Sequence, residues 1–245
     1  MISSLQRLTM VFLISVSLFT AAIADEVVSP NEFTSAEAPQ NNRFPIFVDG
    51  GIRYQQVFDS GQFNFSGPTY ITEIAFRGDS NPDTGGVLAP ITINGLTLSL
   101  STTQFGPDQL DNVFDQNLGS DNTVVFSGSQ TFSSDGAINP DGTANFDFRF
   151  LLDTPFLYDP SAGSLLLDVL NTDVDGDDIG YFFDAADNIQ GDSVSRVFSG
   201  EGDFNSRVGD SDSVGVVTQF VTVPEPGTCG LIVLLAFGLI RRQRA

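Results

Sequence analysis

The chain has 245 residues, with 31 acidic side chains against 10 basic ones and a net charge of −21. All the basic residues are arginines, there is no His or Trp, and the one cysteine has no intrachain partner. These absences exclude histidine-dependent triads, histidine-ligated metals, lysine-dependent phosphate loops and intrachain disulfides. The negative charge argues against nucleic acid as a partner, because binding there begins by neutralising phosphates.

The charges are unevenly distributed along the chain. All 31 acidic residues lie between Asp25 and Glu225, together with six of the ten arginines, so this span carries a net charge of −25. Both ends of the chain are apolar with basic flanks. Such asymmetry predicts processing segments on either side of a mature domain.

The N-terminal segment has the pattern of a secretory signal peptide. Arg7 precedes an apolar run over residues 8–19, and the small-residue pattern Ala22-Ile23-Ala24 follows it. The run is too short to span a membrane comfortably and has the length of a signal-peptide core. We predict a signal peptide over residues 1–24, cleaved by signal peptidase after Ala24. The alternative is an uncleaved N-terminal anchor.

The folded body is expected to begin after a polar stretch. Residues 25–43 contain Pro30 and Pro39 and lack hydrophobic periodicity, which predicts a polar leader or a loosely attached strand. Short apolar alternations separated by Gly, Pro, Asn and Asp then start at Phe44 and predict strands. One of these strands should carry Glu73 and Arg77 on its polar face. Its apolar face would consist of Tyr70, Thr72, Ile74 and Phe76.

Further along, three segments give clear strand patterns. The cleanest half-buried strand alternates Phe146, Phe148 and Phe150 with Asp147 and Arg149. The nearly continuous apolar run over residues 165–170 predicts a central strand, and residues 214–223 predict a final one.

A parity switch and a row of hydroxyls occur close together. At Asn94-Gly95 the apolar positions change parity, which either a two-residue hairpin or a bulge at Gly95 explains. Directly after it, hydroxyl side chains alternate with leucines. The hydroxyl row consists of Thr97, Ser99, Ser101 and Thr103. One row predicts a solvent-facing strand face, since an ice-binding face would need many.

These elements predict an all-β fold. Many short strands separated by turn residues, without a convincing helical window, indicate an antiparallel β-sandwich over residues 44–222, jelly-roll-like in its connections. No internal repeat of 20–50 residues is present, which argues against a solenoid or a propeller.

The densest acidic cluster lies at residues 171–178. Oxygen-bearing side chains occupy alternate positions and Gly176 the sixth, as in the first half of an EF-hand-type calcium loop. The proposed calcium ligands are Asn171, Asp173, Asp175 and Asp177. The twelfth position is Phe182 instead of the expected glutamate, so a plain solvated loop is the alternative.

The C-terminal segment combines three features in a fixed order. Pro224-Glu225-Pro226 is followed by an apolar stretch over residues 227–240 and then by an arginine cluster. The cluster consists of Arg241, Arg242 and Arg244. A short transmembrane helix with a cytoplasmic basic tail explains this order, because arginines stay on the cytoplasmic side. A buried apolar helix is the alternative, but it would have to bury three arginines.

This ending, over residues 223–245, resembles the PEP-CTERM sorting signal of Gram-negative and related bacteria. The resemblance implies that Pro224, Glu225 and Pro226 are recognised by exosortase, a membrane protease-transpeptidase that removes the anchor during export. The body also resembles a recurrent β-sandwich ectodomain of PEP-CTERM proteins. The matching segments are residues 53–58, 71–77, 154–160, 163–169 and 215–220.

The sequence therefore predicts an exported acidic surface or extracellular-matrix protein with a structural or binding role. It would be anchored transiently in the inner membrane and then reside at the cell surface or in the matrix, where polysaccharide is a candidate partner. The alternative is a calcium-assisted carbohydrate-binding module or a polysaccharide hydrolase. A hydrolase would have to use a pair of carboxylates, because the chain has no other abundant acid-base group.

Overall fold

The computed structural model describes residues 24–173 and 179–225, and within them the protein is all-β. Every ladder between strands is antiparallel, and three short 3-10 turns occur at Asn31–Phe33, Ser60–Gln62 and Phe114–Gln116. The predicted antiparallel all-β class is thus confirmed. The predicted signal peptide before Ala24 and the C-terminal helix lie outside the described residues.

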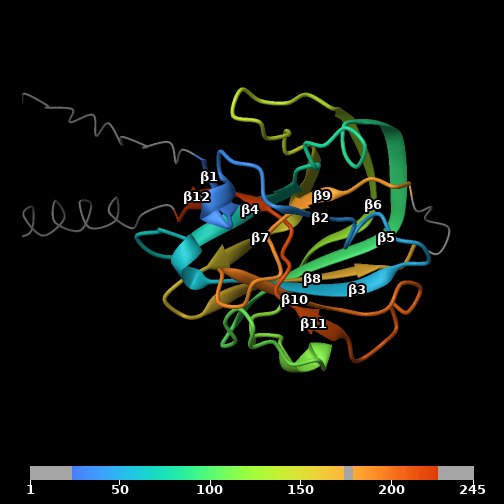
Figure 1. The fold of residues 1–245 in the computed structure, drawn as a ribbon. Coiled ribbons are helices and arrows are strands. Elements are labelled where there is room, and N and C mark those ends of the chain that lie inside the picture. The colour runs from blue at the N-terminus through green and yellow to red at the C-terminus, as the bar shows by residue number, and fades with distance from the viewer. Residues whose placement is uncertain (1–23, 174–178, 226–245) are drawn as a thin grey trace, which may run out of the picture. The chain divides into compact units, whose positions relative to one another are not determined.

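Two large sheets face each other in a sandwich (Figure 1). The first has the order β1 (Asp25–Ser29), β12 (Thr218–Pro224), β4 (Thr69–Phe76) and β7 (Phe148–Tyr158). The second has the order β11 (Asp210–Asp212), β10 (Val194–Phe198), β3 (Ile52–Phe58), β8 (Ser164–Asn171), β5 (Val87–Thr103) and β6 (Thr123–Asp135). A small third sheet pairs β2 (Gln40–Asn42) with β9 (Phe183–Ala185).

The strand pairing is nested along the chain. β1 pairs with β12, β3 with β8, β4 with β7, and β5 with β6. The first and third of these pairs lie in the four-stranded sheet, and the second and fourth lie in the six-stranded sheet. The chain therefore passes back and forth between the two sheets, and the outermost pair joins the two ends of the domain.

The space between the sheets is filled mainly by phenylalanine and leucine. Phe148 and Phe150 of β7 are fully buried, whereas Arg149 between them is exposed, so the predicted alternation is confirmed for these residues. It does not extend to Phe146, which lies before β7 and is only partly buried, outside the main core. Phe47 is at the centre of an aromatic cluster, with its ring centroid 5.1 Å from that of Phe183 and 5.5 Å from that of Phe148. Edge-to-face and offset contacts of this kind stabilise aromatic cores beyond their buried area.

The central position predicted for residues 165–170 is confirmed by β8, which lies between β3 and β5. Leu165, Leu167 and Val169 face the sandwich core. Leu166 and Asp168 point to the opposite face and are nevertheless buried. The apolar run is continuous because this strand is covered on both faces.

The predicted apolar face of β4 is wrong at Tyr70 and Thr72. A bulge between Ile71 and Glu73 shifts the register against β7, so that Ile71 joins Ile74 in the core. Tyr70 and Thr72 are only partly buried. A bulge adds one residue to the strand and therefore reverses the side-chain parity on either side of it.

At Asn94-Gly95 the structure has a bulge and not a hairpin. β5 continues through both residues, and its register against β6 shifts between Ile93 and Leu96. Gly95 has a φ of +64°, and a Cβ there would lie 2.2 Å from Thr172 Oγ1. Only glycine meets both conditions without strain.

Residues 25–43, expected as a polar leader or a loosely attached strand, supply two strands of the fold. β1 pairs with β12 along its whole length, and β2 pairs with β9. Val28 of β1 packs with Ala38 and Val217 in a small apolar cluster on the outer side of the four-stranded sheet. The segment lacks periodicity because only a few of its side chains are buried.

A buried ion pair lies beneath this N-terminal segment. Arg77 is fully buried, and its Nε donates to Asp184 Oδ2 at 2.6 Å while its Nη2 donates to the Ala36 carbonyl at 2.6 Å. Asp184 is also fully buried and accepts from the Ala38 amide at 3.0 Å. The predicted exposed position of Arg77, on a polar face with Glu73, is therefore wrong, because residues 36–38 and β9 enclose it.

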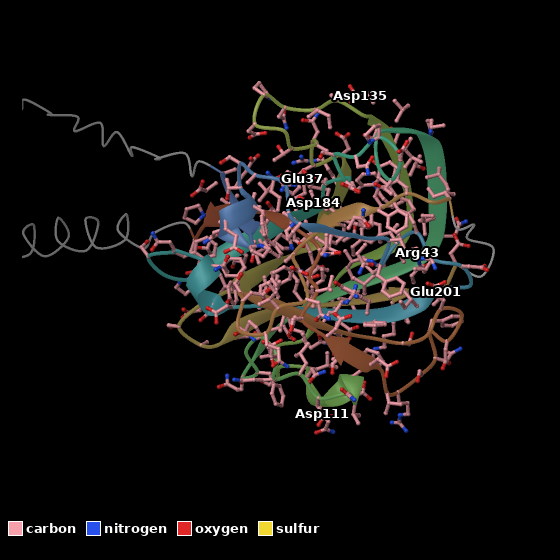
Figure 2. The ribbon with its side chains drawn as sticks, viewed as in Figure 1. Glu37, Arg43, Asp111, Asp135, Asp184 and Glu201 are labelled. Carbon is pink, nitrogen blue, oxygen red and sulfur yellow. The ribbon has the colours of Figure 1, made fainter. Side chains whose placement is uncertain are left out.

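Glu37 lies beside this ion pair (Figure 2). Burial raises the pKa of Glu37 to about 7, the charge of Asp184 adds to the rise, and a hydrogen bond from the Ser80 amide opposes it. Because this pKa is higher in the folded chain than in the unfolded one, the stabilisation that Glu37 contributes is complete in acid. It is lost as the pH rises from about 4.5 through 7.

Glu37→Gln should therefore stabilise the protein at alkaline pH. The free energy of unfolding of the variant should exceed that of the wild type by about 1 to 3 kcal/mol at around pH 8, and the difference should shrink towards pH 5. Urea denaturation followed by circular dichroism across this range measures the difference. A constant difference would contradict the assigned titration.

Candidate functional site

A cleft of about 420 Å³ opens on the outer face of the six-stranded sheet. Its floor comes from β3, β5 and β8, and its walls come from residues 115–122 and 204–207. The lining residues are Arg53, Thr97, Ser99, Asp115, Leu118, Asn122, Asp168, Leu170, Phe204, Asn205, Ser206 and Arg207. The volume falls in the range of small-molecule and cofactor pockets, about 300 to 1,000 Å³.

The floor consists of two adjacent cross-strand rows. Register places Gln55, Asp168 and Ser99 opposite one another in the first row. Arg53, Leu170 and Thr97 are opposite one another in the second row. Because side chains two apart along a strand share a face, all six project from the side of the sheet that faces away from the core.

Arg53 holds the two carboxylates of the cleft. Its Nη2 donates to Asp168 Oδ2 at 3.0 Å, and its Nη1 lies 3.1 Å from Asp115 Oδ1. Burial alone would lower the pKa of Arg53, but the hydrogen bonds and charges of Asp168 and Asp115 outweigh it and raise the pKa above its ordinary value. Gln55 Nε2 adds a second donor to Asp168 Oδ2, at 3.0 Å. The guanidinium and both carboxylates are therefore fixed in place.

One wall of the cleft belongs to the long loop between β5 and β6. Phe114 of this loop is fully buried, and the Arg53 guanidinium lies 4.8 Å from the centroid of its ring. Asn117, also fully buried, donates to Gln55 Oε1 at 2.9 Å. These contacts hold the loop against the polar outer face of the sheet. Each buried charged group that takes part in them has a partner of opposite charge.

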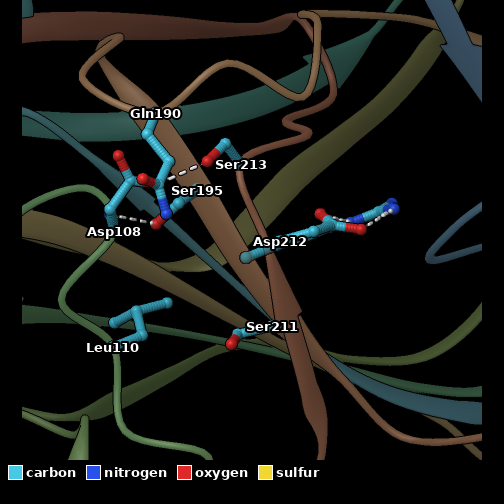
Figure 3. Close-up of a pocket in the computed structure, with 8 residues that line it drawn as sticks. Asp108, Leu110, Gln190, Ser195, Ser211, Asp212 and Ser213 are labelled. Atoms are coloured by element: carbon cyan, nitrogen blue, oxygen red, sulfur yellow. Dashed lines mark hydrogen bonds and ion pairs between the residues drawn. The ribbon is translucent and has the colours of Figure 1, made fainter.

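The same loop is tied down at its start by Asp108 (Figure 3). The Asp108 amide donates to Ser195 Oγ at 2.7 Å, and its carboxylate accepts from Ser213 Oγ and from the Gly191 amide. Asp108 has a φ of 61°, an uncommon backbone conformation for a residue with a side chain. These bonds surround a cavity of about 90 Å³, which is too small for more than a few waters, so we assign Asp108 a structural role.

The opposite wall is built on Gly51 and the loop that contains Phe204. A Cβ at Gly51 would lie 3.1 Å from Cδ1 of Phe204 and 2.5 Å from the Asn171 carbonyl. The Gly202 amide donates to the Gly51 carbonyl at 2.8 Å. Glycine at position 51 thus lets the Phe204 ring approach the start of β3 and form the side of the cleft.

The rim carries side chains with unused hydrogen-bonding capacity. Asn122 and Asn205 are exposed, and in the described part of the chain their amide groups make no hydrogen bond. Arg207 is 86% exposed and approaches Asp115 only to 4.0 Å. The cleft as a whole contains two arginines and two aspartates, so it is locally neutral on a strongly acidic protein.

The hydroxyl row predicted to face solvent is largely covered. Ser99, Ser101 and Thr103 are each less than one-tenth exposed. Ser101 Oγ accepts from the Gly119 amide at 3.1 Å, and Thr103 Oγ1 accepts from the Phe105 amide. The prediction is wrong because the loop that follows β5 folds back over this face of β5. The covered face is therefore not available to bind ice.

The predicted processing residues lie at the two ends of the described chain. Ala24 and Glu225 are exposed, and Pro224 is the last residue of β12. The remaining processing residues lie outside the described residues. They are Ala22, Pro226, Arg241, Arg242 and Arg244.

Two of the four predicted calcium ligands can be placed, and they lie at the end of β8. Asn171 is buried, donates to the Pro45 and Ile46 carbonyls, and accepts from the Asp173 amide at 3.0 Å. Asp173 Oδ2 accepts from the Asn94 amide at 2.7 Å. Asp175 and Asp177 lie outside the described residues, so the calcium site stays a prediction. Within residues 24–173 and 179–225, no group of three acidic or sulfur ligands is arranged to hold a metal.

The cleft was missed at the sequence level, although one signal pointed to it. Asp168 interrupts an otherwise apolar run, and Gln55 and Gln56 interrupt β3 in the same way. A polar residue inside a strand that is buried on both faces must be hydrogen-bonded or paired. That requirement could have indicated a polar network outside the core, but not which loops enclose it.

Among the described residues, no helix has the length and hydrophobicity needed to cross a membrane. Comparison of the chain with protein-family models, with curated proteins and with solved structures found no match.

Proposed function

We propose that this chain is an exported, acidic surface or extracellular-matrix protein with a binding role, sorted by an exosortase-type system. In this proposal the signal peptide is removed after Ala24, and the segment from Pro224 to Pro226 is the sorting motif. The chain is held transiently in the inner membrane before it reaches the cell surface or the matrix.

The position of the two ends of the domain carries this proposal. Asp25 pairs with Thr222, and Pro224 pairs with Thr69, so the start of β1 and the end of β12 lie at the same end of the four-stranded sheet (Figure 1). Both predicted processing sites thus border one edge of the sandwich. This arrangement suits a precursor held at both ends by one membrane, because neither connecting segment has to run along the length of the domain.

We also propose that the sandwich is a jelly roll. The nested pairing of β1 with β12, β3 with β8, β4 with β7 and β5 with β6 supports this, since an eight-stranded jelly roll wraps a long antiparallel ribbon into two sheets. β10 and β11 extend the second sheet beyond this core of eight strands.

A binding role is favoured over hydrolysis by the state of the cleft carboxylates. Asp115 and Asp168 both contact Arg53, and Asp168 also accepts from Gln55. A glycosidase needs one carboxyl group free to donate a proton and a second free to act as base or nucleophile. Two carboxylates that are both paired with the same guanidinium are better suited to shaping a binding surface than to acid-base catalysis.

Replacement of Pro224, Glu225 and Pro226 by Ala should abolish maturation. The prolines make the motif stiff and non-helical, so three alanines would remove both its shape and its charge. Cell fractionation and immunoblotting in a host with an exosortase should show a longer species retained in the membrane, with release reduced to near zero.

A matched control replaces three exposed loop residues, Asn64, Ser66 and Pro68, by Ala. This control should mature like the wild type. If the motif variant is processed and released as efficiently as this control, the sorting proposal is wrong.

A further inference from the structure

We infer that the cleft on the outer face of the six-stranded sheet binds a neutral polysaccharide. The inference deepens the binding role proposed above by assigning it a site and a ligand class. It depends on three properties of the cleft: its charge balance, its free polar groups and its apolar surfaces.

The charge balance selects for neutral ligands. Arg53 and Arg207 offset Asp115 and Asp168 within the cleft, whereas residues 25–225 as a whole carry a net charge of −25. The field of such a domain repels polyanions before they reach the surface. A cationic ligand would gain more from the many other carboxylates of the domain than from a cleft whose two carboxylates already have a partner.

The free polar groups match a polyhydroxylated ligand. The side-chain amides of Asn122 and Asn205 each offer a donor and an acceptor. Within the part of the chain that the structure describes, neither amide makes a hydrogen bond. A side-chain amide can pair with two neighbouring hydroxyls of a sugar, donating to one and accepting from the other. Arg207 adds further donors at the mouth, where it is 86% exposed.

The apolar side chains of the cleft match the apolar faces of a sugar ring. Phe204 forms one side of the cleft, and Leu118 lines the other wall, both of them half-buried. Leu170 adds an apolar side chain to the floor. Sugar rings present carbon-bound hydrogens on their flat faces, which pack against such side chains while their hydroxyls reach the amides.

The side chains on the floor of the cleft are preorganised for binding. Arg53, Asp168 and Gln55 are joined by hydrogen bonds and ion pairs, and Asp168 is less than one-tenth exposed. A site whose groups are already ordered loses less entropy on binding. An unbranched neutral chain could thus lie along the cleft between Asn122 and Asn205 without rearranging the sheet.

Affinity electrophoresis of the purified full chain tests the inference. Native gels in mild detergent and EDTA would contain a neutral polysaccharide (hydroxyethylcellulose, laminarin or dextran) or the polyanion alginate. EDTA removes bridging by calcium. The wild type should be retarded by at least one neutral polysaccharide and not by alginate.

Asn122→Ala and Asn205→Ala should each weaken the retardation about three- to tenfold, as expected for losing one or two hydrogen bonds, and Phe204→Ala should act similarly. Matched controls outside the cleft, Asn64→Ala and Leu151→Ala, should migrate like the wild type. All five side chains are exposed or half-buried, and unchanged circular dichroism would establish that each variant is folded.

Three outcomes would overturn the inference: no retardation by any of the neutral polysaccharides, retardation by alginate as strong as that by the neutral polysaccharides, or retardation that the three cleft variants leave unchanged. Because the measurement uses purified protein, it does not depend on sorting. A failure here leaves the fractionation result for the Pro-Glu-Pro motif untouched, and the reverse also holds.

Discussion

Asp184→Ala is expected to lower the free energy of unfolding by about 3 to 5 kcal/mol, because it leaves the fully buried Arg77 guanidinium without its counter-ion. The carboxylate also accepts from the Ala38 amide, which would lose its partner. For a domain of this size the melting temperature should fall by about 10 °C. Thermal melts followed by circular dichroism measure the change.

Glu201→Ala is the matched control, because it removes the carboxylate from a partly exposed ion pair with Arg43 (Figure 2). Exposed pairs contribute at most about 1 kcal/mol, since water solvates the separated charges well. If both variants lose the same stability, the ion pair between Arg77 and Asp184 is not buried as described.

Phe150→Ala should destabilise the protein by about 3 to 5 kcal/mol. The ring is fully buried between the sheets, with its centroid 5.3 Å from those of Phe126 and Phe132. Truncation removes these contacts and leaves a cavity that rigid strands cannot fill. Urea denaturation monitored by circular dichroism reports the loss, and the chain's lack of tryptophan makes this probe preferable to fluorescence.

The adjacent Leu151→Ala serves as the control on the same strand. Leu151 is 73% exposed, so its truncation should change the stability by less than about 0.5 kcal/mol. Equal losses at the two neighbouring positions would contradict the assignment of β7 as a strand with one buried and one exposed face.

The strands with regular alternation could be predicted because their pattern depends on only two faces. Phe148 and Phe150 are two positions apart at the start of β7, and that spacing alone determines that they point the same way. Residues 165–170 were recognisable as a central strand because they are apolar on both faces. In the same way, short alternating strands separated by turn residues indicated an antiparallel all-β fold.

Where a strand bulges, its local pattern misleads. The bulge between Ile71 and Glu73 moves Ile71 into the core and Tyr70 out of it, and nothing in the spacing of these residues distinguishes the two arrangements. The parity change at Gly95 was visible in the sequence, but a bulge explained it nearly as well as a hairpin. Pairing with β6, the next strand, and with the more distant β8 decided between them.

The sequence by itself determined the antiparallel all-β class, several of the strands and the acidic character of the body, but it did not reveal the two strands that residues 25–43 supply. Only the tertiary structure decided what covers the outer faces of the sheets. Arg77 and Ser101 occupy positions that the alternation assigns to solvent, and both are buried beneath segments that return from elsewhere in the chain. The cleft depends on the same effect, since Arg53, Asp115 and Asp168 meet through β-pairing and loop packing across more than a hundred residues. Periodicity reports the faces of one strand, whereas a site formed by several strands and loops depends on contacts that no local pattern encodes.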